Sequence, residues 1–167
     1  MSSIKIVADS TCDLSPELIR DYGITILPLN IVLDMTSYSD GEEISPDEIY
    51  VWAQANKRTP KTAAVAFDRA LALVKGMKEN QEEVIFIGIS SEMSTTCNVM
   101  RLGKEELEYD RMFIIDSRNL STGIGLQVLR AAQLAQEGRS AEEIVKEIEE
   151  ARDKVRASFV VERLDYL

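Results

Sequence analysis

Short apolar runs bounded by polar turns recur along the chain, and each has the length of a buried β-strand. They predict strands over residues 4–9, 24–34, 83–89, 111–117 and 157–167. Pro28 interrupts the second run, and because proline has no N–H to donate, we expect it at an edge or a bend. The segments between the runs carry apolar residues at helical spacing.

These intervening segments also carry the start and stop signals of helices. They predict helices over residues 16–22, 45–55, 67–80, 98–109, 126–138 and 141–155. Ser45 with Glu48, and Ser140 with Glu143, stand at the spacing of a capping box, in which each side chain satisfies the other's backbone N–H. Gly23 suits the end of the first helix.

Two segments show neither the apolar runs of a strand nor the apolar spacing of a helix. Residues 38–44 carry turn residues and are expected to form a small ribbon, whereas residues 58–66 are expected to be an irregular connection. Alternating strands and helices joined by short connections predict an α/β fold with a largely parallel sheet flanked by helices. The 167 residues are enough for one domain with a sizeable core.

Hydroxyl side chains follow three of the predicted strands, within residues 9–11, 90–96 and 116–122. Because the carboxyl ends of parallel strands meet at one edge of the sheet, we expect the three segments to lie close together. Serine and threonine at such places often only cap the next helix. Three clusters on one edge favour a ligand site over capping alone.

The formal charge of −10 argues against binding to nucleic acid or to anionic membrane surfaces, because both would be repelled. No stretch has the roughly 20 apolar residues needed to span a bilayer, so membrane insertion is not expected. The first residues enter a strand at once, which leaves no room for a signal peptide. We therefore expect a cytoplasmic protein with reduced thiols at Cys12 and Cys97.

The chain contains no histidine, which excludes nucleophile–histidine catalysis and histidine-ligated zinc within it. It lacks the glycine-lysine motif of a phosphate-binding loop, and Cys12 lies beside Asp13, whose charge raises the pKa of a thiol. We expect no catalysis, no metal and no cofactor. Hydroxyls and helix N-terminal N–H groups suit a small anion such as a carboxylate.

Several motifs, in this order along the chain, resemble the DegV family: KIVADSTCDLSPEL, TPKTA, IGISSEMSTT, IIDSRNLSTGIG and FVVERLDYL. The resemblance covers essentially the whole chain. It implies binding of a long-chain fatty acid such as hexadecanoate, without catalysis. It also implies a possible role like that of the FakB subunit, which presents the acyl carboxylate to a fatty acid kinase.

The resemblance also implies which residues hold the carboxylate. The threonine of the family's first binding segment matches Thr62, and the serine of its second matches Ser94. Thr95 and Ser91 are weaker candidates on the same turn. Two positions depart from the family pattern: Ala63 replaces a serine, and Thr95 replaces a glycine, so its side chain either crowds the carboxylate or adds a donor.

The family continues beyond the point where this chain stops. By resemblance, residues 1–155 are expected to form the N-terminal α/β domain, and residues 156–167 the start of a second, truncated domain. Apolar surface left by the absent half favours a homodimer through that face. Two alternatives remain open: a binder of another small anion, or a truncated domain with little ligand binding, whose serines only cap helices.

Overall fold

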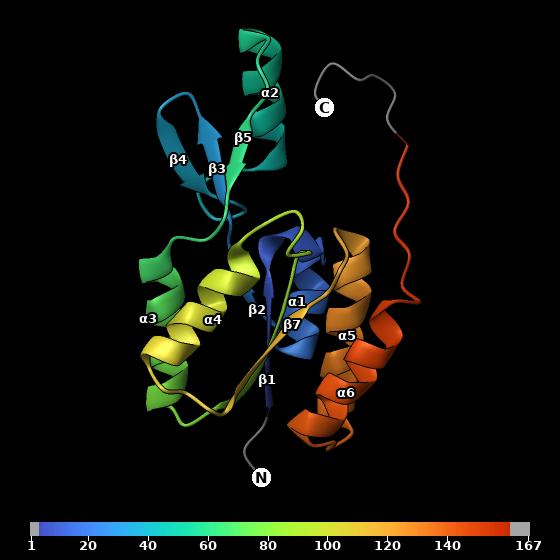
Figure 1. The fold of residues 1–167 in the computed structure, drawn as a ribbon. Coiled ribbons are helices and arrows are strands. Elements are labelled where there is room, and N and C mark those ends of the chain that lie inside the picture. Colours follow the sequence, from blue (N-terminus) through green and yellow to red (C-terminus); the bar gives the residue numbers. More distant parts are fainter. Residues whose placement is uncertain (1–3, 161–167) are drawn as a thin grey trace.

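The most apolar runs of the sequence pair into a four-stranded parallel sheet in a computed structural model that describes residues 4–160 (Figure 1). The strands are β1 (Ile4–Asp9), β2 (Thr25–Leu27), β6 (Glu83–Gly88) and β7 (Met112–Asp116), in the order β2-β1-β6-β7. The two central strands are β1 and β6, so their side chains are almost continuously buried. The predicted parallel sheet is confirmed.

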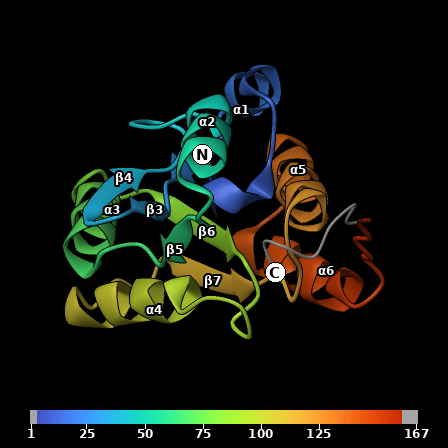
Figure 2. The same ribbon diagram turned by 90° about the horizontal axis from the view of Figure 1, so that it is seen from above.

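Helices cover both faces of this sheet (Figures 1 and 2). One face carries α1 (Pro16–Tyr22), α5 (Thr122–Gln136) and α6 (Ala141–Arg152), and the other carries α3 (Phe67–Glu79) and α4 (Thr96–Glu106). Successive strand residues serve opposite faces: Ile85 packs with the first group and Phe86 with the second. The sheet and these five helices are called the body below.

A second, three-stranded antiparallel sheet stands above the carboxyl ends of the body's strands (Figure 1). It consists of β3 (Asn30–Leu33), β4 (Thr36–Ser39) and β5 (Lys61–Ala63), in the order β4-β3-β5, and α2 (Pro46–Asn56) joins β4 to β5. We call residues 30–63 the small lobe. Its buried apolar residues Leu33, Ile44 and Ala53 belong to neither of the body's two core clusters.

The run over residues 24–34 is extended and is interrupted at Pro28, as expected, but it forms two strands that pair in different sheets rather than one. A second prediction in this region was wrong. Residues 58–66 are not wholly irregular, because they contain β5. The three residues of β5 are all exposed and show no apolar alternation, so the sequence carried no signal for this strand.

Most helix ends follow the predicted signals. The Ser15 hydroxyl accepts the N–H of Leu18, Gly23 has φ +62°, and both capping boxes form. The fifth predicted helix was placed too late, because α5 begins at Thr122 within a glycine-rich stretch typical of a loop. Gly125 serves packing instead: a Cβ there would lie 2.7 Å from the Cys12 carbonyl oxygen.

The last predicted strand, residues 157–167, is not supported where it can be checked. Residues 157–160 have no regular secondary structure, and residues 161–167 lie outside the described part of the chain. The apolar residues Phe159 and Val160 are exposed and meet no neighbouring strand that would order them. The sixth helix is also shorter than predicted and ends at Arg152.

The buried carboxylate of Asp9 joins the ends of the two central strands. Its Oδ2 accepts the Ile89 N–H at 2.7 Å, and its Oδ1 accepts the Thr11 N–H at 3.1 Å and the Thr11 hydroxyl at 2.5 Å. Burial raises the pKa of Asp9 above its ordinary value, because desolvation outweighs these hydrogen bonds. The first hydroxyl cluster of the sequence is thus organised by a carboxylate.

Replacing Asp9 by Asn should destabilise the protein by about 1–3 kcal/mol, because an amide cannot satisfy both the Ile89 and the Thr11 donors. A raised native pKa means that the carboxyl group stabilises the fold most below its unfolded-state pKa and loses this contribution as the pH rises through the native pKa. The stability gap between wild type and Asp9→Asn should therefore be wider at pH 4 than at pH 7. Urea unfolding at both pH values measures it, and a gap that widens with pH would contradict this account.

The two thiols should be inert in the native protein. Cys12 and Cys97 are free and buried, and burial raises the pKa of Cys12 to about 11 and that of Cys97 to about 12. At pH 8 a water-soluble thiol reagent should react with neither residue, and with both after unfolding in urea. Rapid labelling of the folded protein would show that a thiol is exposed.

Candidate functional site

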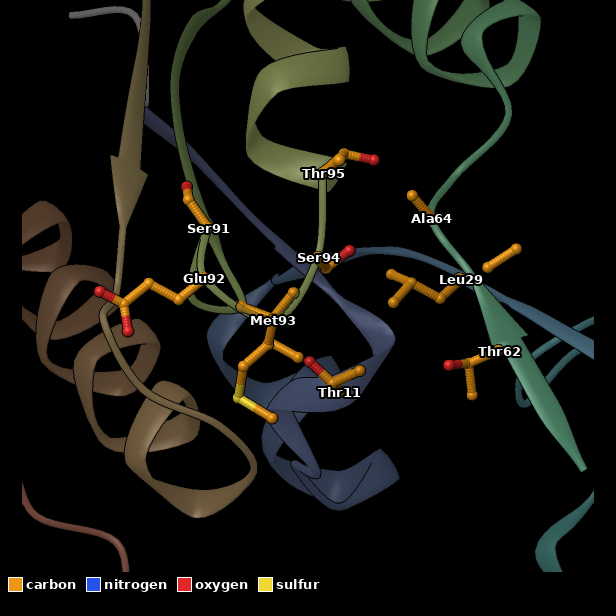
Figure 3. A pocket seen from close by; sticks show the side chains of 11 residues that line it. Thr11, Leu29, Thr62, Ala64, Ser91, Glu92, Met93, Ser94 and Thr95 are labelled. Carbon is orange, nitrogen blue, oxygen red and sulfur yellow. The ribbon is translucent and has the colours of Figure 1, made fainter. Parts of the chain in front are cut away.

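A pocket of about 480 Å³ lies between the carboxyl edge of the large sheet and the small lobe (Figure 3). This volume falls within the roughly 300–1,000 Å³ of typical small-molecule sites. Its polar lining residues are Thr11, Thr62, Ser91, Glu92, Ser94 and Thr95. Its apolar ones are Leu29, Ala63, Ala64, Ile89 and Met93. All four site residues predicted from the sequence thus line one pocket.

Thr62 and Ser94 reach this pocket from opposite walls. Thr62 lies on β5 of the small lobe, and Ser94 lies in the loop between β6 and α4. In Figure 3 the Thr62 hydroxyl points across the gap toward the loop, and the Ser94 hydroxyl points toward the lobe. They are 32 positions apart in the sequence and meet only because the lobe folds back over the sheet edge.

The Ser94 hydroxyl is oriented by the start of α4. Its oxygen accepts the Thr96 N–H at 3.2 Å and lies 3.0 Å from the Thr96 hydroxyl. Thr96 is fully buried, so its own hydroxyl is restricted to such local partners. When Ser94 accepts both of these donors, its own hydrogen is left to point into the pocket, where an anion would receive it.

The loop that carries Ser94 is held by its backbone N–H groups. Asp9 accepts the N–H of Ile89, the Asn119 carbonyl accepts that of Ser90 at 3.0 Å, and Asp116 accepts that of Ser91 at 3.3 Å. The next three N–H groups, of residues 92–94, all bond to Ser90. The loop is therefore fixed before any ligand arrives, which favours tight binding.

Asp116 anchors the far end of this loop. Partial burial raises its pKa, but hydrogen bonds from the Arg118 N–H and from Ser91 outweigh that effect, and the pKa of Asp116 lies below its ordinary value. The carboxylate thus remains charged when it holds Ser91. In Figure 3 the Ser91 side chain points away from Thr62, so this residue contributes mainly through its backbone.

The two departures from the expected motif have different consequences. Thr95 has φ −83°, a value open to any residue, so the fold does not require glycine there. Its hydroxyl makes no helix-capping bond and points toward Ala64 at the rim (Figure 3). Ala63 removes a hydroxyl that a serine would place on the same strand as Thr62.

Sequence reasoning missed the apolar wall of the pocket. Leu29 and Ile89 are nearly buried, and each stands just beyond a strand, where the pattern marked them as ordinary core residues. Met93 is 60% exposed at the mouth. Thr11 belonged to a recognised hydroxyl cluster, and its place in the pocket follows from its bond to Asp9.

The third hydroxyl cluster does not line the pocket. In that segment the Ser121 hydroxyl donates to Asp13 at 2.5 Å, and Asn119 supports the loop through its carbonyl. Within residues 4–160 no group of three or more acidic or cysteine side chains is placed to hold a metal ion. In the same range no helix is both long and apolar enough to cross a membrane.

The sequence model of the DegV family, described as an uncharacterised protein family, matches residues 3–167. A DegV domain-containing protein of Clostridium perfringens, CPE1310, is 41% identical over all 167 residues. The chain spans 60% of the length of that relative.

Two solved structures share the fold. A DegV family protein from Thermus thermophilus, described by its fatty acid binding, aligns with a TM-score of 0.82 at 31% identity, over 92% of this chain and 54% of its own. A protein from Eubacterium ventriosum, described as binding stearic acid, aligns with a TM-score of 0.80 at 26% identity, over 87% of this chain and 52% of its own.

Proposed function

The chain belongs to the DegV family, and from this premise and the pocket geometry we propose that it binds a long-chain fatty acid. Thr62 and Ser94 hold the carboxylate, with Thr95 as a further donor at the rim and Ser91 supporting the loop. The observation that carries the proposal is the pairing of two hydroxyls from opposite walls with an apolar lining. Proteins of this fold described as binding fatty acids support it.

The donors that line the pocket are neutral hydroxyl groups. None of its eleven lining residues is a lysine or an arginine, so the carboxylate receives neutral donors rather than an ion pair. Each hydrogen bond to a charged group contributes about 1.5–3 kcal/mol. A buried methylene contributes about 0.8 kcal/mol, so a long acyl chain supplies roughly 10 kcal/mol before association costs. The tail supplies most of the affinity, and the hydroxyls fix its orientation.

The remaining parts of the proposal concern the whole protein. We propose that the ligand is a long-chain fatty acid such as hexadecanoate, that the protein is a non-catalytic cytoplasmic binder, and that it presents the carboxylate to a fatty acid kinase. Residues 1–155 form its α/β domain and residues 156–167 begin a second domain. We also propose a homodimer through the apolar surface against which the second domain would pack, where Phe159 is exposed.

A short acid or a phosphate is the second candidate. It would use the same hydroxyls but would leave the apolar side of the pocket without a function, since Leu29, Ile89 and Met93 offer it nothing. The apolar lining therefore favours the long-chain acid. A comparably large hollow of about 490 Å³ between α3 and α4 offers no hydroxyl donor among its lining residues, Phe67, Leu102, Glu105 and Glu106.

Native mass spectrometry of the purified chain, followed by solvent extraction, tests the proposed ligand directly. We expect a co-purified fatty acid at up to one per chain. A chain that stays empty after incubation with hexadecanoate, yet binds phosphate or acetate, would overturn the proposal in favour of the second candidate.

Removing either hydroxyl should weaken binding of hexadecanoate. Ser94→Ala and Thr62→Val each delete one donor to the carboxylate, so each should raise the Kd roughly tenfold to a hundredfold in a fluorescence displacement assay. Ser94→Ala also frees the Thr96 N–H, which costs about 0.5–2 kcal/mol of stability. Thr62 lies on an exposed strand, so Thr62→Val should leave stability within about 0.5 kcal/mol.

Thr36→Val and Ser37→Ala are matched controls on β4, the opposite edge strand of the same small sheet. Both residues are exposed and outside the pocket lining, so the same chemical changes should leave affinity unaltered. If the controls weaken binding as much as the site variants, or if Thr62→Val binds like wild type, the assignment of the carboxylate to this pair of hydroxyls fails.

A further inference from the structure

The small lobe is attached to the body mainly at its two connecting segments. At the first, the N–H of Leu29 donates to the Ser10 hydroxyl at 3.1 Å, and at the second, Val65 is buried in the core beside α3 and α4. Beyond these connections the lobe has its own small core. A unit held in this way has few contacts that oppose its rotation about the connections.

Arg69 spans the gap between the body and the lobe. It lies in the first turn of α3, just after the second connection, and reaches back to β4 and the loop that follows it. Its Nη1 donates to the Ser39 hydroxyl at 2.7 Å, and its Nη2 lies 2.5 Å from Glu42 Oε2. Within residues 4–160, these are the side-chain hydrogen bonds that link the body to residues 30–63.

One of the two partners of Arg69, Ser39, is itself fixed. Ser39 is 8% exposed, and its N–H donates to Glu43 at 2.7 Å. That bond from Ser39 lowers the pKa of Glu43, so the carboxylate that holds Ser39 stays charged. A planar guanidinium that bonds to two separate oxygens fixes direction as well as distance, which a single lysine ammonium does not.

The position of Arg69 is unfavourable for its own helix. A cation in the first turn opposes the helix dipole, which favours negative charge there. Asp68 adds a negative charge to the same turn, but the direct ion pair of Arg69 is with Glu42 of the lobe. A residue that is unfavourable for its own helix but paired across the contact between two parts of a protein indicates that the relative position of those parts is important.

The walls of the pocket belong to the two parts that Arg69 joins. Thr62 is carried by the lobe, and Ser94 by the body. Any rotation of the lobe changes the separation of these two hydroxyls, on which a carboxylate held by both depends. The pocket geometry therefore depends on how firmly the lobe is held.

We propose that Arg69 is a positioning residue, which fixes the small lobe over the sheet edge and so sets the gap between Thr62 and Ser94. It touches no ligand, since it does not line the pocket. The inference rests on the proposed function for its effect on affinity. Its effect on lobe position is independent of any ligand, so the two are tested separately.

The position of the lobe is measured by pulsed electron–electron double resonance, which gives the distribution of distances between two spin labels. Met35→Cys at the tip of the lobe and Asn98→Cys on α4 offer exposed thiols, while Cys12 and Cys97 are buried and stay unlabelled. In the Arg69→Met variant the distance distribution should broaden or shift relative to wild type. Arg69→Lys should give a distance distribution between those of wild type and Arg69→Met, because the ammonium keeps the positive charge but not the two fixed, planar N–H donors of the guanidinium.

Arg58→Met is the matched control. Arg58 is an exposed arginine that pairs with Asp34, and both residues lie inside the small lobe, so its loss removes an ion pair without crossing the gap. This variant should leave the distance distribution as in wild type. An Arg69→Met distribution that coincides with the wild-type one would overturn the proposal, whether or not any fatty acid binds.

The effect on the site is measured by a double-mutant cycle with hexadecanoate as the probe. Arg69→Met should raise the Kd about three- to tenfold, the range expected for a partly exposed charged pair. In this background Thr62→Val should cost less than in wild type, because Thr62 is already displaced. Fully additive effects would contradict a positioning role. If wild type binds no hexadecanoate, the proposed function fails. The distances between the spin labels then test by themselves whether Arg69 positions the small lobe.

Discussion

The hydrogen bonds accepted by the buried Asp9 carboxylate are the constraint from which both walls of the pocket follow. On one side Asp9 holds Ile89, from which the loop carrying Ser94 departs. On the other it holds Thr11 in the turn that follows β1, where the neighbouring Ser10 accepts the N–H of Leu29 at the entrance to the small lobe. The desolvation of a charged group is the cost of this arrangement, and three convergent donors offset only part of it, so the pKa of Asp9 stays above its ordinary value.

Neither the net charge of the chain nor the lining of the pocket provides a positive charge that would attract an anion. A protein with a formal charge of −10 does not attract anions at long range, and the pocket lining adds no cation. The proposed binding of a carboxylate therefore depends on short, fixed donors and on burial of an apolar tail. Fixing the donors requires the loop bonds to Asp9 and Asp116 on one wall and a firmly held lobe on the other.

The body was predictable from the sequence because its strands and helices follow clear periods, and the capping box at Ser140 formed as expected. In the small lobe α2 and its capping box at Ser45 were predicted too, but the three-stranded sheet was not, since β5 is exposed and three residues long. Thr62 and Ser94 were identified only through family resemblance. That they line one pocket depends on the break at Pro28 and on antiparallel pairing between β3 and β5, which local patterns do not encode.

Carboxyl-¹³C hexadecanoate provides the most direct measurement of the central claim, because its NMR resonance reports the surroundings of the head group itself. We expect a bound resonance, distinct from that of the free acid, which moves in Thr62→Val and again in Ser94→Ala. The matched β4 variants should leave it in place. A bound carboxyl resonance that is identical in wild type and in both site variants would show that the acid binds elsewhere.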